Sequence, residues 1–369
     1  VLREVGDARA TGALVAELDR DRVEATLVLE ALGATKDPAA LLPLLGALDH
    51  KEAAVRLAAM RALTGVIGKD ARAADVLALR LADPDAEIRA LAATYLGELL
   101  ATVAVDALVA RVGAGEPVAV RRAAIAALGE IADAKAAPAL IAILRDGPGE
   151  LHRDAADALV SVADDASLET LGTLARGQRG VPQAHVVRVV AAIARRTGAA
   201  GATKLLLDMT TKGGAAASTA AIAGLASAAP AEAEAALLKL LTDASADRRR
   251  LAAWALGAMG AVAAVPALIA VLPLRDDKLA GDAAWALGEI AASGEAGRRA
   301  VVDAGAVGPL LKAANAGGWA TAISTTGALA RIAAATAPAD LAKTFADPAA
   351  AERLMFHRSA MVRVNAALL

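Results

Sequence analysis

Two histidines are the first residues whose type and spacing could do chemistry. Among the chain's 4 histidines, His152 and His185 lie nine positions before Ser161 and Ala194, which mark equivalent places in a recurring pattern. On neighbouring helices the two imidazoles could ligate a metal ion, but a site needs further ligands. Asp154 is the only obvious one, so the sequence favours surface histidines at helix starts and predicts no metal site.

Other catalytic signatures are missing. The chain has no cysteine, which excludes disulfides, thiolate zinc sites and cysteine nucleophiles. It contains no G-x-x-x-x-G-K-[ST], G-x-G-x-x-G or G-x-S-x-G pattern, so phosphate cradles and nucleophile elbows are not indicated. We predict no catalytic residues, no cofactor and no enzymatic activity.

A repeated hexapeptide leads to the architecture. AAWALG occurs at Ala252–Gly257 and again 31 residues later at Ala283–Gly288, and together the copies hold two of the 3 tryptophans. The glycine that ends each copy belongs to a series of eleven equivalent positions: Arg3, Gly33, Thr64, Gly97, Gly129, Ser161, Ala194, Ala226, Gly257, Gly288 and Ala330. We call these the landmark positions. Their steps run from 30 to 33 residues except the last, which is 42.

Each repeat is predicted to be a pair of helices. The first carries leucine and isoleucine at helical spacing, as in Leu140, Ile143 and Leu144, and a polar turn such as Asp83-Pro84-Asp85 follows. One hairpin cannot bury its apolar face, whereas stacked hairpins form a continuous core. The sequence therefore predicts an all-α fold, a right-handed α-solenoid of about eleven repeats that forms one domain over residues 1–369.

The second helices carry a recognisable signature. The pattern D-x-x-x-x-VR-x-x-A-x-x-ALG-x-I resembles HEAT and phycobilin-lyase-type HEAT-like repeats over nearly the whole chain. Ala283–Ala314 is similar instead to an armadillo repeat, so residues 277–317 are expected to form an armadillo-like unit whose extra short helix explains the 42-residue step. The resemblance implies a superhelix that binds other proteins. Because the chain starts and stops inside second helices without polar caps, we expect a fragment cut at both ends, with the rest of its own longer chain as a neighbour.

Arginines recur eight residues before the landmarks, and turn acids such as Asp49, Asp83, Asp146 and Asp243 precede several of them. The series resembles the Asp–Arg ladder of HEAT proteins, in which arginine satisfies turn carbonyls and pairs with neighbouring aspartates. The alternative is that the arginines form a basic stripe that binds an acidic partner. The sequence favours the ladder, because the nearby acidic residues cancel the positive charge of such a stripe. The predicted structural ladder consists of Arg56, Arg89, Arg121, Arg153, Arg249 and Arg363.

The armadillo resemblance also implies a partner groove. Its inner face takes the positions three before and one after each landmark, which here are Arg61, Glu98, Glu130, Arg195, Trp254, Trp285, Glu289 and Arg331. Importin-alpha-like adaptors hold Trp and Asn at these positions. Ala258 and Glu289 stand in place of the Asn here, so the side chains that would bind the backbone of a peptide are missing. We hypothesise that Trp254 and Trp285 anchor a partner segment; the alternative is that each ring fills a gap in the core.

Charge and hydropathy argue against two classes of partner, nucleic acid and the lipid bilayer. A formal net charge of −2 gives no general attraction to nucleic acid. Leu251–Leu274 is uncharged and long enough to span a bilayer, but it reads as two alanine-rich helices with Pro266 in the first turn of the second, so no membrane span is expected.

The predicted function is that of a cytoplasmic scaffold or adaptor that binds a protein or an extended peptide. Two alternatives stay open: a bilin-lyase-like enzyme or chromophore-binding protein, and a nucleic-acid-binding HEAT protein.

Overall fold

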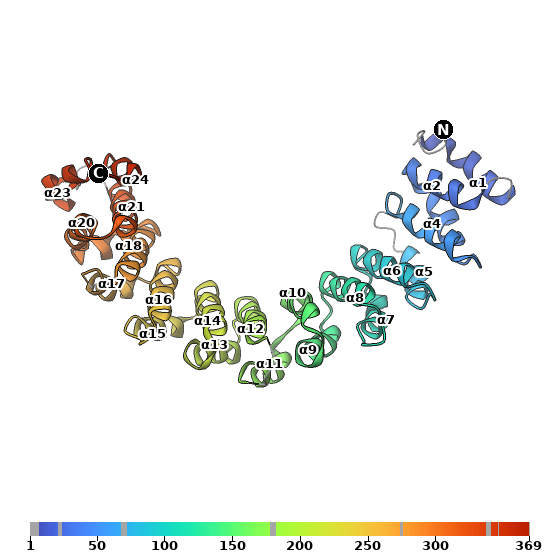
Figure 1. Cartoon of the computed structure of the whole chain (residues 1–369), viewed down its shortest axis with the longest axis horizontal. Coiled ribbons are helices and arrows are strands. Elements are labelled where there is room, and N and C mark those ends of the chain that lie inside the picture. Colours follow the sequence, from blue (N-terminus) through green and yellow to red (C-terminus); the bar gives the residue numbers. More distant parts are fainter. Residues whose placement is uncertain are drawn as a thin grey trace. The chain divides into compact units, whose positions relative to one another are not determined.

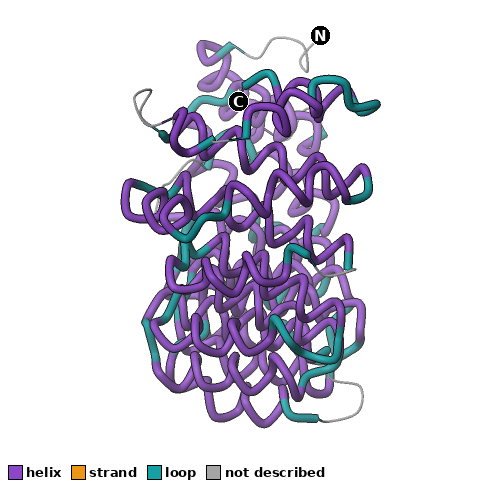
Figure 2. Tube along the Cα trace, turned by 90° about the vertical axis from the view of Figure 1, so that its left-hand side faces the viewer, coloured by secondary structure: helices purple, strands orange, loops and turns teal. Residues whose placement is uncertain are grey.

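A computed structural model describes residues 7–20, 24–67, 72–177, 182–273, 276–336, 341–345 and 347–368. Throughout these ranges the regular structure is helical, and no strand occurs in them (Figure 2). The all-α repeat-solenoid fold predicted from the sequence is thereby confirmed. Val1–Gly6, which holds the first landmark, lies outside the described residues.

The chain divides into two compact units, residues 1–170 with 180–182, and residues 171–179 with 183–369. The helices of the first unit are α1 Thr11–Arg20, α2 Ala25–Thr35, α3 Leu41–Ala47, α4 Ala53–Leu63, α5 Arg72–Arg80, α6 Ala86–Glu98, α7 Val105–Arg111, α8 Val118–Ile131, α9 Ala137–Asp146 and α10 His152–Val162. Helix α11, Leu168–Ala175, contains the boundary.

The second unit continues with α12 Gln183–Thr197, α13 Ala200–Lys212, α14 Ala215–Ala228, α15 Ala231–Leu240, α16 Ala246–Ala258, α17 Val265–Val271, α18 Asp277–Ala292, α19 Glu295–Asp303, α20 Val307–Ala316, α21 Trp319–Ala335, α22 Leu341–Thr344, α23 Pro348–Leu354 and α24 Ala360–Ala366. Short 3₁₀ helices open several hairpins: η1 Ala8–Ala10, η2 Pro38–Ala40, η3 Thr102–Ala104, η4 Ala134–Ala136, η6 Asp165–Ser167 and η7 Val262–Ala264. A further one, η5 Gly149–Leu151, lies inside a hairpin, directly before its second helix α10.

The landmarks mark the second helix of each hairpin. Within the described residues each lies in, or directly after, α2, α4, α6, α8, α10, α12, α14, α16, α18 or α21. These second helices pack on one another inside each unit, as α6 does on α8 and α16 on α18 (Figure 1). The residue before the landmark forms the core: Leu96, Leu128, Leu256 and Leu287 are fully buried. The leucine therefore recurs in the sequence because stacking buries the same position in these hairpins.

Glycine occupies several of the landmarks at which neighbouring second helices approach closely. A Cβ added at Gly33, Gly97, Gly129 or Gly257 would lie within 3.0 Å of the Cα of an alanine on the next second helix. Real Cβ atoms essentially never approach so closely. Glycine paired with alanine thus sets the short distance between neighbouring second helices.

The uncharged stretch at Leu251–Leu274 divides as expected. Helix α16 ends at Ala258, and α17 starts at Val265 with Pro266 in its first turn. Between them Gly260 adopts a φ of +65°, a left-handed conformation that suits glycine. Among the helices of the described ranges, none is both long and apolar enough to cross a bilayer.

The 42-residue step contains one helix more than the others. Between Gly288 in α18 and Ala330 in α21 lie both α19 and α20. Helix α19 packs on α18 and on η7, the turn before α17. The division into a single domain and the exact number of repeats stay predictions.

Candidate functional site

Trp254 lines a hollow on the second-helix face of the second unit. The hollow has a volume of about 650 Å³, and its walls come from α14, α16 and α18. Its lining residues are Ala215, Ser218, Thr219, Ala223, Ser245, Asp247, Arg248, Arg250, Leu251, Trp254 and Asp282. The Trp254 residue is 38% exposed, so a flat apolar surface is open to a ligand.

Two ion pairs frame the indole. Arg250 Nε donates to Asp282 Oδ2 at 2.7 Å, joining α16 to α18, and Arg248 Nε donates to Asp243 Oδ1 at 2.9 Å. Burial raises the pKa of the Asp282 carboxyl, and the hydrogen bond from Arg250 opposes that rise. The arginines are thus held in place by carboxylates, and the hollow offers an apolar floor with a polar, charge-balanced rim.

Sequence reasoning did not identify this rim. Arg248, Arg249 and Arg250 are consecutive on α16, and only Arg249 fell on the recurring ladder position. A helix turns by about 100° per residue, so adjacent arginines serve different faces. A parallel pair, Arg122 on α8 with Asp154 on α10, has the same 32-residue separation as Arg250 and Asp282. That shared spacing was the available signal.

Trp285 occupies the same repeat position but has different surroundings. It is half-buried and does not line the hollow. Its ring atom Cζ3 lies 3.1 Å from the place a Cβ would take on Gly257. The indole therefore packs on the glycine of the preceding second helix.

The remaining groove candidates fall into three groups. Arg61 pairs with Glu87, and Arg331 Nε lies 3.6 Å from Glu289 Oε1, both near the surface. Arg195 is exposed at the end of α12. Glu98 and Glu130 are close enough to interact: partial burial, and then the Glu98 charge, raise the pKa of the Glu130 carboxyl. The groove assignment of these residues stays a prediction.

Three of the predicted ladder arginines follow one pattern. Arg56, Arg89 and Arg249 each donate through Nη1 to two carbonyls of their own turn, at 2.7–3.2 Å. The same guanidinium pairs with a carboxylate 27 residues ahead, on the next hairpin: Asp83, Glu116 or Asp276. Each arginine thus fastens its own turn to the following one.

The other three ladder residues show only part of this pattern or none of it. Arg121 is buried and donates to the Val112 carbonyl at 2.9 Å, and Arg363 donates to the carbonyls of His357 and Arg358. Arg153 is exposed, with its nearest carboxylate, Asp157, at 3.8 Å. In that hairpin His152 Nε2 donates to the Gly147 carbonyl at 3.0 Å, and so takes over a turn contact.

The histidines do not form a ligand cluster. His152 belongs to the first unit and His185 to the second. In the part of the chain that the structure describes, no group of three or more His, Asp or Glu side chains is placed to hold a metal ion.

Comparison with protein families supports the repeat assignment. Residues 74–160 match HEAT repeats, and residues 248–272 match the PBS lyase HEAT-like repeat. The resemblance to HEAT-like repeats is thereby confirmed, and the second match includes Trp254. No curated protein matches the sequence.

Solved structures of the same fold include karyopherins. A Kap121p mutant is similar with a TM-score of 0.68 and 13% identity, covering 98% of this chain and 45% of that one. Kap121p bound to the extreme C-terminus of the protein phosphatase Cdc14p has a TM-score of 0.67, with 13% identity and the same coverages. A structure of Kap95p with RanGDP has a TM-score of 0.55 and 14% identity, covering 98% and 51%. This chain spans about half the length of these proteins or less, and the likeness shows the fold alone.

Proposed function

We propose that this chain is a non-enzymatic scaffold that binds an extended segment of a partner protein on the second-helix face of its second unit, with Trp254 as the anchor. The observation that carries the proposal is an indole that is 38% exposed inside a hollow of about 650 Å³. Partly exposed tryptophans in pockets are typical binding hot spots.

The chemistry of the hollow favours a particular kind of segment. Trp254 and Leu251 offer an apolar floor for one large side chain, and Arg248 and Arg250 lie at the rim. Because both guanidiniums are already paired with carboxylates, they favour hydrogen bonding to carbonyls over capture of a highly acidic chain. The partner is therefore a protein segment with an apolar or aromatic anchor. That Kap121p, of the same fold, binds a protein C-terminus is consistent with this use.

A peptide library displayed on phage and selected on the intact chain tests the proposal. Selected peptides are then titrated calorimetrically against the wild type, Trp254→Ala and Trp319→Ala. Trp319 is the control because it is 63% exposed and lies outside the hollow. Trp254→Ala should weaken binding by about 2 kcal/mol and Trp319→Ala should leave it unchanged. Equal affinity of all three proteins would remove Trp254 from the binding site.

A bilin-binding role is the second candidate, since the PBS lyase HEAT-like match covers residues 248–272. Mixing the protein with a free bilin tests it. A new visible absorbance band that Trp254→Ala abolishes would favour chromophore binding, and an unchanged bilin spectrum would eliminate it.

We further propose a cytoplasmic location, with which a chain without cysteine is compatible.

A further inference from the structure

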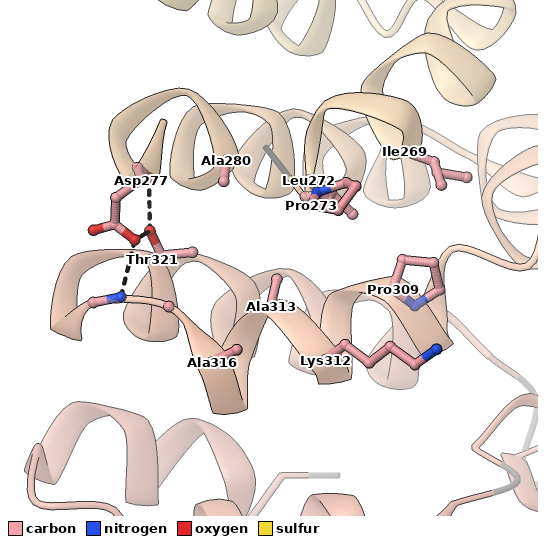
Figure 3. A pocket seen from close by; sticks show the side chains of 12 residues that line it. Ile269, Leu272, Pro273, Asp277, Ala280, Pro309, Lys312, Ala313, Ala316 and Thr321 are labelled. Carbon is pink, nitrogen blue, oxygen red and sulfur yellow. Dashed lines mark hydrogen bonds between the residues drawn. The ribbon is translucent and has the colours of Figure 1, made fainter. Parts of the chain in front are cut away.

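A second hollow lies at the 42-residue step, away from Trp254. Its volume is about 800 Å³, and it separates the end of α17 from α20 (Figure 3). Helices α18 and α21 contribute the residues that join these two walls. The lining residues are Ile269, Leu272, Pro273, Asp277, Ala280, Pro309, Lys312, Ala313, Ala316, Gly317, Gly318 and Thr321.

The inserted helix explains why this space is not filled. Helix α19 packs on η7, at the start of α17, so it takes the position beside the beginning of that helix. The half that remains, Ile269–Pro273, faces Pro309, Ala313 and Ala316 on α20. Small side chains on α20 leave the space between the two apolar walls open. The hollow is therefore a consequence of the longer repeat.

A fixed carboxylate lies at one end of the hollow. Asp277 Oδ1 accepts hydrogen bonds from the Gly318 N–H at 2.9 Å and from the buried Thr321 hydroxyl at 2.6 Å (Figure 3). The Thr321 hydroxyl also contacts the Asp277 carbonyl at 2.6 Å. Asp277 is exposed, and its second carboxylate oxygen, Oδ2, accepts no hydrogen bond from the described residues and points away from Ala280 and Leu272 (Figure 3). Asp277 is also the first residue of α18, where the helix dipole stabilises its negative charge.

A cation lies at the other end. Lys312 is exposed on α20, beside Pro309 (Figure 3). Its ammonium is carried by a flexible chain, whereas the Asp277 carboxylate is held by two hydrogen bonds. The preorganised charge of this hollow is therefore negative.

We propose that the hollow binds an apolar organic cation, with an aliphatic or aromatic body between α17 and α20 and an amino group at the Asp277 carboxylate. The volume lies within the roughly 300–1,000 Å³ of small-molecule sites, which are mostly apolar with a few fixed polar groups. This site is independent of the partner site at Trp254.

Octylamine, octanol and octanoate are matched probes, because they share an apolar chain and differ in charge. Calorimetric titration should show that octylamine binds most tightly, octanol less tightly and octanoate least tightly. Asp277→Asn keeps an acceptor for Gly318 and Thr321 but removes the charge. It should weaken octylamine binding about fivefold, to the level of octanol, and leave octanol binding unchanged.

Ala313→Leu fills the hollow and should abolish binding of all three probes. Ala270→Leu, on an exposed position of α17 outside the lining, is the control and should bind like the wild type. Tryptophan fluorescence, to which Trp319 next to Gly318 contributes, checks that the second unit of each variant remains folded. Octylamine binding that survives both Asp277→Asn and Ala313→Leu would overturn the site, and tighter binding of octanoate would overturn its preference for a cation. Neither result would affect the proposal for Trp254.

Discussion

Gly257 of α16 lies directly against Ala286 of α18. A Cβ at Gly257 would be 2.5 Å from the Ala286 Cα and 3.1 Å from Trp285 Cζ3. The contact explains why the repeated hexapeptide ends in glycine, because no larger residue fits between these second helices.

Gly257→Ala should therefore destabilise the second unit by about 1–3 kcal/mol, since overpacking forces the backbones apart. Tryptophan fluorescence during urea unfolding measures the effect, because all 3 tryptophans lie in this unit. Gly308→Ala is the matched control on α20, where an added Cβ meets nothing within 4 Å. A Gly257→Ala protein as stable as the control would refute the close-packing role.

Arg121→Ala should lower the free energy of unfolding of the first unit by about 1–3 kcal/mol, because it leaves the buried Val112 carbonyl without its donor. Arg153→Ala, at the same ladder position, should change it by less than about 0.5 kcal/mol, because the Arg153 side chain is 82% exposed. Hydrogen exchange in α8 and α10 distinguishes the two. Neither variant should alter the affinity of the peptides selected on the intact chain, because the proposed binding site lies in the second unit. A loss of affinity without a loss of stability would place the ladder in the binding surface.

Acid should loosen the links between hairpins. The hydrogen bond from Arg249 lowers the pKa of Asp276; for Asp83, burial raises the pKa, but hydrogen bonds from Arg56 and the Asp85 N–H outweigh it, leaving the pKa lowered. A carboxyl whose pKa is lower in the folded protein stabilises the fold at pH values above its ordinary pKa of 3.8. This stabilisation is lost as the pH falls through the lowered pKa.

The free energy of unfolding should accordingly fall as the pH drops below about 4. Asp276→Asn should reduce the pH dependence of the second unit, read by tryptophan fluorescence, and leave that of the first unit unchanged, read by hydrogen exchange. Identical acid profiles for the variant and the wild type would exclude Asp276 as a contributor.

Replacement of Trp254 and replacement of Trp285 should change the stability of the second unit by different amounts. Trp285→Ala should destabilise the second unit by about 1–3 kcal/mol, because its half-buried ring packs on Gly257. Trp254→Ala should cost less, because its ring is partly exposed in the hollow. Thermal melting of both variants tests this. If Trp285→Ala melts like the wild type and weakens peptide binding, then Trp254 and Trp285 are paired anchors.

Much of this architecture can be predicted from the periodicity alone. Leu96, Leu128 and Leu256 recur before the landmark because every second helix buries the same stripe, and burial leaves a direct imprint on residue type. Arginines at the starts of the second helices, such as Arg56 and Arg249, donate to turn carbonyls, and these carbonyls belong to the same hairpin.

What depends on the neighbouring hairpin could not be predicted in this way. Asp83, Glu116 and Asp276 pair with arginines 27 residues earlier, and this partner choice depends on how adjacent turns are stacked. Trp254 and Trp285 share one repeat position, yet one lines a hollow and the other lies on a glycine, because each ring responds to a different preceding helix. The hollow beside Asp277 arises from the packing of α19 on η7. A repeat records what every hairpin buries by itself, whereas contacts between hairpins depend on side chains and spacings that differ at each step, and only the tertiary structure brings these together.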